Sequence, residues 1–176
     1  GSEGTSGVYV RGGGPDQNLI LLDGVPVYNA SHLFGFFSVF NADAIHSTKL
    51  IKGGFPARYG GRLSSVIDIK MKEGNMKEFH GEGSIGLISS KLTLEGPIKK
   101  DKTSFLISAR RTYIDILAQP FIRRAQKNNN DDPNSNSSNS GGYYFYDING
   151  KINHKFSDKD RLYFSHYMGR DRAYLN

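Results

Sequence analysis

The side chains that could do chemistry are spread along this chain without the spacing that a catalytic or metal site needs. There is no cysteine, and the five histidines are His32, His46, His80, His154 and His166. Zinc ligands come in short, regular spacings, whereas these histidines are isolated from one another. No serine has an identifiable His and Asp partner that would make it a nucleophile. We therefore expect no enzyme activity, no metal and no cofactor, and place the histidines on strand faces and surfaces.

A glycine run could also bind phosphate, but its context here is wrong. Gly12–Gly14 is followed neither by a GxGxxG turn into a helix nor by a Walker lysine. The sequence contains 21 glycines, and glycine allows backbone conformations that tight turns require. We therefore interpret this run as a turn.

The net charge is confined to one segment. Between Lys99 and Lys127 there are eight basic and two acidic residues, which accounts for the whole net charge of +6. A nucleic-acid-binding surface would interleave its basic residues with exposed aromatic side chains, and this cluster leads instead into an Asn/Ser tract. We interpret it as a solvated loop and expect no nucleic-acid partner.

The first 75 residues predict a small α+β unit. Short apolar runs predict strands over 18–22, 49–52 and 65–70. The pair Asp23-Gly24 between two apolar runs predicts a hairpin, because its turn needs positive φ angles. Asn41 is a good N-cap for a short helix over 42–46.

From residue 78 onward the pattern becomes one of strands with two different faces. The longest case spans 143–156, where Tyr144, Tyr146, Ile148 and Ile152 alternate with Phe145, Asp147, Asn149, Lys151 and Asn153. Leu106 breaks the alternation of its own run. The segments approach the roughly ten residues with which a tilted strand crosses a bilayer, and no run approaches the ~18 apolar residues of a transmembrane helix. A soluble β-sandwich could show the same alternation.

The connections also alternate in length. Polar turns at 99–102 and 157–159 are short, whereas an Asn/Ser-rich loop lies near 118–142. Short turns at one end and long loops at the other are typical of outer-membrane barrels. The aromatic run Tyr143–Tyr146 beside the long loop fits an interfacial girdle, with a sugar-stacking platform as the alternative.

Several motifs together resemble the plug domain of TonB-dependent outer-membrane receptors. They are Val10-Arg11-Gly12-Gly13, the run from Gln17 to Tyr28, Asn41-Ala42-Asp43-Ala44-Ile45, and the run from Lys52 to Ile69. The segment Gly53-Gly54-Phe55-Pro56-Ala57-Arg58-Tyr59-Gly60-Gly61 is similar to receptors of the Bacteroidota lineage. The segments 94–98 and 108–113 are similar to the start of the receptor barrel.

The resemblance implies an α+β plug domain followed by antiparallel transmembrane β-barrel strands. Residues 1–75 would be the C-terminal part of the plug, and 76–176 would form about five strands of a large barrel. The rest of a receptor, including a signal peptide, a TonB box and most of about 22 strands, is expected to lie outside this chain. We therefore expect a fragment of a longer protein.

Within that fold, the basic residues of the front segment would meet acidic residues of the barrel lumen. The plug–barrel contact candidates are Arg11, Arg58 and Arg62 on the plug with Glu82 and Glu95 on the strands, as Arg–carboxylate pairs; simple solvation in a wet lumen is the alternative. The expected plug turn motifs are Gly12, Gly13, Asp23, Gly24, Gly53, Gly54, Gly60 and Gly61, with the later glycines letting the plug backbone approach the wall.

The resemblance implies energised uptake of a bulky nutrient (a siderophore, glycan or peptide) across a Gram-negative outer membrane. TonB would be the partner, acting through a coupling box not present in this chain. Outer-membrane lipid, a surface lipoprotein or other outer-membrane subunits would be further partners. The alternatives are a non-transporting plug-barrel subunit of a larger outer-membrane assembly and a secreted, carbohydrate-binding β-domain.

Overall fold

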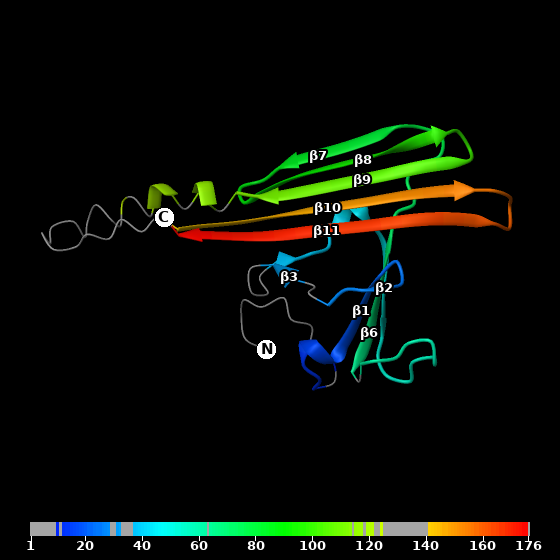
Figure 1. Ribbon diagram of the computed structural model, residues 1–176, viewed down its shortest axis with the longest axis horizontal. Coiled ribbons are helices and arrows are strands. Elements are labelled where there is room, and N and C mark those ends of the chain that lie inside the picture. The colour runs from blue at the N-terminus through cyan, green and yellow to red at the C-terminus, as the bar shows by residue number, and fades with distance from the viewer. Residues whose placement is uncertain are drawn as a thin grey trace, which may run out of the picture.

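The computed structural model describes residues 10, 12–28, 31–32, 37–62, 64–113, 115–117, 119–121, 124 and 141–175. The described residues form two main sheets (Figure 1). A four-stranded sheet in the order β2-β1-β6-β5, together with its loops up to residue 71, is called the front unit below. A five-stranded sheet in the order β11-β10-β9-β8-β7 is called the wall. The predicted domain boundary at residue 75 falls in the connection between them.

The front unit is built around β1 (Asn18–Leu22) and β6 (Ser65–Met71), which pair in parallel. β2 (Val25–Pro26) joins β1 through the predicted hairpin, in which Asp23 and Gly24 have φ angles of 49° and 85°. β5 (Ile45–Ile51) is antiparallel to β6. A separate small pair is formed by β3 (Ser31–His32) and β4 (Phe37–Ser38).

In the described part of the front unit there are also two short 3-10 helices, η1 (Pro15–Gln17) and η3 (Ala42–Ala44). Asn41 caps η3 as predicted, and its side chain accepts a hydrogen bond from the Asp43 amide. The predicted helix over 42–46 is too long, because Ile45 is already extended and pairs with Met71. The pairing of Ile45 with β6 therefore ends the helix that begins at the Asn41 cap.

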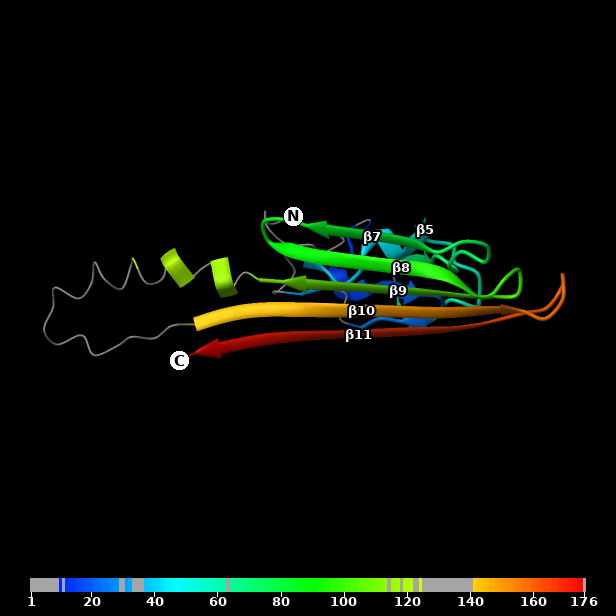
Figure 2. The same cartoon turned by 90° about the horizontal axis from the view of Figure 1, so that it is seen from above.

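The wall is an antiparallel meander in which each strand pairs with the next along the chain. Its strands are β7 (His80–Ile85), β8 (Ser89–Lys99), β9 (Thr103–Thr112), β10 (Gly141–Lys155) and β11 (Arg161–Leu175). Seen from above, the strands lie side by side along the length of the molecule (Figure 2). Turns at 100–102 and 156–160 end the sheet on one side, and the connection from β9 to β10 leaves from the other.

The two faces of the wall differ as the alternation predicts. The face toward the front unit carries buried polar side chains, namely Thr93, Ser104, Ser108, Thr112, Asp147, Asn149, Lys151 and Asn153. The opposite face carries exposed apolar side chains, namely Leu92, Leu94, Ile107, Ile152, Leu162, Phe164 and Met168. None of the described helices has the length and apolar character to cross a bilayer.

The buried apolar core is small and lies mainly in the front unit. Leu22, Ala44, Ile69 and Met71 form it, and Leu106 of the wall completes it with 0% exposure. Leu106 breaks the alternation of β9 because it faces the front unit and fills this core. The remaining contacts across the two sheets are mostly polar.

Candidate functional site between the front unit and the wall

Acidic residues of the front unit and of the connection that follows it meet cations of the wall. Three ion pairs cross between them: Asp23–Lys151, Asp43–Lys91 and Glu73–Arg161. The cations lie on β8, β10 and the start of β11, so the pairs are spread over several strands. This distribution holds the front unit against the broad face of the wall instead of along one strand.

Asp23 and Lys151 form the most buried of these pairs. Their side chains are 4% and 5% exposed, and Lys151 Nζ lies 3.1 Å from Asp23 Oδ2. Asp23 Oδ1 also accepts a hydrogen bond of 3.0 Å from the Met71 amide, and Oδ2 accepts one from Ser165 Oγ. Lys151 donates in addition to the Met71 carbonyl and lies 4.9 Å from the centre of the Tyr163 ring. Asp23 therefore forms a hydrogen bond within its own sheet and polar contacts with two wall strands, β10 and β11.

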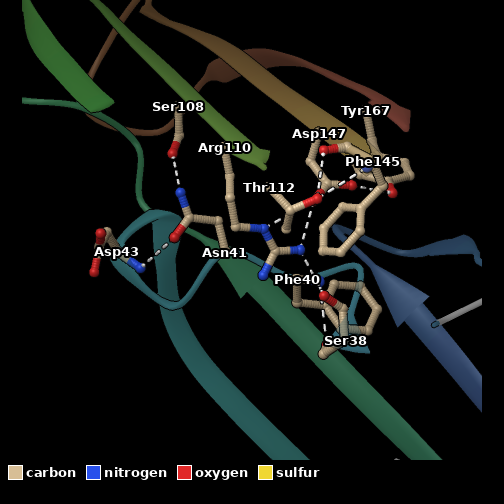
Figure 3. A network of polar contacts seen from close by, with 10 residues as sticks. All are labelled: Ser38, Phe40, Asn41, Asp43, Ser108, Arg110, Thr112, Phe145, Asp147 and Tyr167. Atoms are coloured by element: carbon tan, nitrogen blue, oxygen red, sulfur yellow. Dashed lines mark hydrogen bonds and ion pairs between the residues drawn. The ribbon is translucent and has the colours of Figure 1, made fainter. Parts of the chain in front are cut away.

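A second contact lies where η3 meets β8 and β9. Asn41 Nδ2 donates to Ser108 Oγ at 2.5 Å (Figure 3). Ser108 Oγ is in turn 2.9 Å from Thr93 Oγ1. Asp43 Oδ2 lies 2.6 Å from Lys91 Nζ in a partly exposed pair. The residue that caps η3 thus also attaches it to the wall.

A third contact is centred on Arg110, whose guanidinium group bridges the wall and β4. Its Nε and one terminal nitrogen donate to Asp147 Oδ2 at 2.9 and 2.5 Å, and the same terminal nitrogen donates to the Ser38 carbonyl at 2.6 Å (Figure 3). Asp147 is fully buried and also accepts a hydrogen bond of 3.0 Å from Tyr167. The planar guanidinium group also lies over the Phe145 ring. A buried carboxylate with these partners is well compensated.

Glu73 makes the most exposed of the ionic contacts. Its carboxylate accepts from Asn153 Nδ2 at 3.0 Å and from Arg161 at 3.3 Å, and about half of both charged side chains is exposed. Its backbone carbonyl accepts from Ser104 Oγ at 2.7 Å. Exposed pairs contribute roughly 0–1 kcal/mol, so this contact positions the connection more than it stabilises the interface.

A cavity of about 950 Å³ lies between the front unit and the wall. Charged side chains of both signs line it, among them Asp23, Arg58, Asp68, Glu95 and Lys151. The buried Asp23–Lys151 pair forms part of its lining.

The structure distributes the predicted contact residues differently from the expectation. Arg58 lies 4.8 Å from the centre of the Tyr59 ring, and Arg62 donates to the carbonyl of its neighbour Gly61. Glu95 lines the same cavity as Arg58, whereas Glu82 is exposed on β7, the edge strand. Arg11 lies outside the described residues.

The interface pairs among the described residues therefore have the opposite polarity from the predicted one. The acids stand on the front unit and its connection, and the cations on the wall, as the three crossing pairs show. Nothing in the sequence marks Asp43 or Glu73 as a contact with the wall, and the Asp23-Gly24 pair predicts only a turn. The signal that could have found Lys151 is its place among the polar, inward positions of β10.

Most of the predicted turn glycines adopt conformations that suit turns. Positive φ angles occur at Gly12, Gly24, Gly53, Gly54 and Gly61. Gly13 lies so close to Ser64 that a side chain there would collide with it. Gly54, Gly60 and Gly61 each have open space where a side chain would be, and their approach to the barrel wall stays a prediction.

The histidines do not form a ligand cluster in the described part of the chain, where no group of three metal-binding side chains occurs. His154 Nδ1 is 2.7 Å from Thr103 Oγ1, and His46 lines the cavity.

Comparison with known proteins agrees with this architecture. The family described as TonB-dependent Receptor Plug Domain matches residues 1–66. No curated protein matches the sequence significantly. Among solved structures, the siderophore receptor PirA from Acinetobacter baumannii is similar, with 23% identity, a TM-score of 0.56, and coverage of 91% of this chain and 24% of that chain.

A mutant of the ferric enterobactin receptor PfeA from Pseudomonas aeruginosa, in complex with enterobactin, is also similar. It has 21% identity and a TM-score of 0.56, and the match covers 91% of this chain and 26% of that chain. The chain thus spans about a quarter of the length of these structures. Front unit and wall together have the fold found in that quarter.

Proposed function

We propose that this chain is a fragment of a TonB-dependent receptor, with its plug domain and adjoining wall strands, and that the receptor is an outer-membrane transporter; the plug-domain match and the similar receptor folds support this. The full protein would take up a bulky nutrient, such as a siderophore, glycan or peptide, with energy delivered through TonB. The motif from Gly53 to Gly61 supports a source in the Bacteroidota lineage.

The observation that carries this proposal is the polar character of the interface between the front unit and the wall. Among the described residues, Leu106 is the buried wall side chain in the apolar core of the front unit, and Tyr167 of the wall packs against that core. The polar contacts are ion pairs and hydrogen bonds centred on Asp23, Asn41, Asp43, Glu73 and Arg110. Such groups can exchange their partners for water, whereas separating an apolar core costs about 25 cal/mol for each Å² exposed.

A plug that must leave the wall and return to it needs an interface in which polar contacts outweigh apolar ones. Buried pairs such as Asp23–Lys151 are strong only in their closed geometry, because the desolvation of both charges opposes their attraction. When water enters, each ion regains hydration. A pulling force on the front unit would therefore meet a set of local contacts that break in turn, and the same contacts specify the register on return.

The exposed apolar face of the wall supports a membrane location. Its side chains between the two sheet ends are those expected to face hydrocarbon, with polar residues on the other face, as in transmembrane barrels. The same face argues against a secreted carbohydrate-binding domain, which would have to cover it with protein.

Reversible cross-linking of the full-length receptor tests the proposal. In one variant Asn41→Cys and Ser108→Cys join the front unit to the wall; in its matched control Thr93→Cys and Ser108→Cys join two wall strands. Both pairs replace side chains that are hydrogen-bonded to each other, and this chain has no other cysteine. Thiols are bridged by oxidation or by a short bifunctional reagent.

We expect the plug-to-wall link to abolish TonB-dependent uptake of the nutrient, and reduction of the disulfide to restore it. The wall-to-wall link should leave uptake unchanged. Uptake that continues with the front unit fully cross-linked would overturn the proposal. A receptor that sits in the outer membrane but shows no uptake in any form, and is recovered only within a larger complex, would favour the non-transporting subunit.

A further inference from the structure

Three arginines lie on the outward, otherwise apolar face of the wall. Arg111, Arg170 and Arg172 are exposed, and the alternation of β9 and β11 places them on the same face as Ile107 and Met168. Strand register aligns Arg111 with Tyr146, Tyr146 with Arg170, and Tyr144 with Arg172. The three cations thus form one cluster across three neighbouring strands, which is called the arginine cluster below.

The arginine cluster lies at one end of the wall only. β9 ends at Thr112 and β10 begins at Gly141, so the cluster stands where the long β9–β10 connection leaves the sheet (Figure 2). Toward the middle of the same face, most side chains are apolar, as at Leu94, Ile107 and Ile152, and His166 of β11 is a polar one among them. An arginine facing hydrocarbon costs about 2–4 kcal/mol at the midplane and little at the interface, so this end belongs at the headgroup level.

Tyr144 contacts two of the arginines, Arg111 and Arg172, without neutralising them. The Arg111 guanidinium group lies 5.1 Å from the centre of the Tyr144 ring, and Arg172 donates to Tyr144 Oη at 3.3 Å. Of the ion pairs among the described residues, none includes Arg111, Arg170 or Arg172. The cluster therefore presents three positive charges with donors available to an anion.

An apolar groove of about 720 Å³ begins beside the cluster. Arg111, Tyr146 and Ile85 line one end of it at the same level of the register, and Leu92, Ala109 and Ile148 line it at the next level along the same face. The small side chain of Ala109, between Leu92 and Ile148 in the register, leaves this part of the face hollow. A groove of this character suits a hydrocarbon chain, and its charged end suits a phosphate group.

We infer that the arginine cluster and the groove together bind a phosphorylated membrane lipid, with its phosphates on the arginines and an acyl chain in the groove. Arginine binds phosphate oxygens through several parallel donors, and juxtamembrane cations attract anionic headgroups. A free phosphate ion would use the cluster but not the groove. The inference rests on the proposed outer-membrane location, which puts this end of the wall in the outer leaflet.

The test uses full-length receptor purified in a neutral detergent, with retained lipid counted by native mass spectrometry. The probe is diphosphorylated lipid A, compared with its dephosphorylated form. The test variant carries Arg111→Gln, Arg170→Gln and Arg172→Gln. The control carries Lys99→Gln, Lys100→Gln and Lys102→Gln at the opposite end of the wall, which removes the same charge from exposed positions.

We expect the arginine variant to bind lipid A at least about tenfold more weakly, which corresponds to losing roughly one charged contact. The lysine variant should bind lipid A as tightly as the wild type does. Ala109→Leu, which fills the groove, should weaken lipid A binding while the arginines remain.

Equal lipid A binding by the arginine variant and the wild type would overturn the inference. So would equal binding of the dephosphorylated lipid, or displacement of lipid A by inorganic phosphate at millimolar concentration. A failure of the proposed function would be recognised separately, because the wild-type protein would then not fractionate with the outer membrane at all.

Discussion

Asp23 and Lys151 lie 128 residues apart in the chain and form an ion pair of 3.1 Å in which both side chains are almost fully buried. Asp23 is also the first turn residue of the β1–β2 hairpin, with a φ angle of 49°. A turn residue of the front unit therefore also forms the most buried of the ion pairs that cross to the wall. A substitution of either residue should therefore affect both the β1–β2 hairpin and the contact with the wall.

Lys151→Met should destabilise the docked front unit by about 3–5 kcal/mol, because it leaves the Asp23 carboxylate buried without its cation. The Met71 amide, which donates to Asp23, should exchange its hydrogen faster. Both effects can be followed by hydrogen exchange and by denaturant titration of the full-length receptor. Adding Asp23→Asn should recover part of the loss, since no uncompensated charge then remains.

The matched control is Lys155→Met, four residues further along β10. Its partner Asp158 is 93% exposed, so removing this pair should cost less than about 1 kcal/mol. Equal losses for Lys151→Met and Lys155→Met would mean that burial of the Asp23–Lys151 pair has no energetic consequence.

Arg110→Lys should weaken the contact between β9, β10 and β4 by about 1–3 kcal/mol. A lysine keeps the charge but cannot contact Asp147 through two nitrogens while also reaching the Ser38 carbonyl. Proteolysis of the β3–β4 region in the folded receptor should become faster. Arg161→Lys, at the half-exposed pair with Glu73, should leave the cleavage rate near that of the wild type.

Leu106→Ala should cost about 2–5 kcal/mol of front-unit docking, because it opens a cavity in the core shared with Leu22 and Met71. Ile107→Ala is the neighbouring control, since Ile107 is 49% exposed on the other face. Chemical unfolding monitored by a probe in the front unit should separate the two. If Ile107→Ala has the larger effect, the assignment of the two faces of β9 is wrong.

Gly24→Ala should destabilise the hairpin by roughly 1–2 kcal/mol, because a φ angle of 85° is strained for a residue with a side chain. Gly24→Asn should be milder, since asparagine tolerates this region better. Thermal unfolding of the two variants gives the comparison. No difference between Ala and Asn would show that the turn relaxes to another conformation.

Much of the fold follows from local signals in the sequence. The Asp23-Gly24 turn, the Asn41 cap and the alternation of 143–156 each depend on neighbouring residues, so each could be predicted. Leu106 interrupts the alternation of its own strand, and the sequence of that strand does not explain why. The explanation is that Leu106 packs in the core of the front unit. The partners of Asp43 and Glu73 could not be predicted, since an acidic residue in a loop carries no sign of the strand it will face.

The connection from β6 to β7 constrains how the front unit can travel. Ser104 Oγ donates to the Glu73 carbonyl, the Asp101 amide donates to the Met76 carbonyl, and Gly74 lies too close to the Phe105 carbonyl for any side chain. These contacts fix the connection to the wall immediately after Met71. A displaced front unit would consequently rotate about the C-terminal end of β6, and the part near η1 would move the greatest distance.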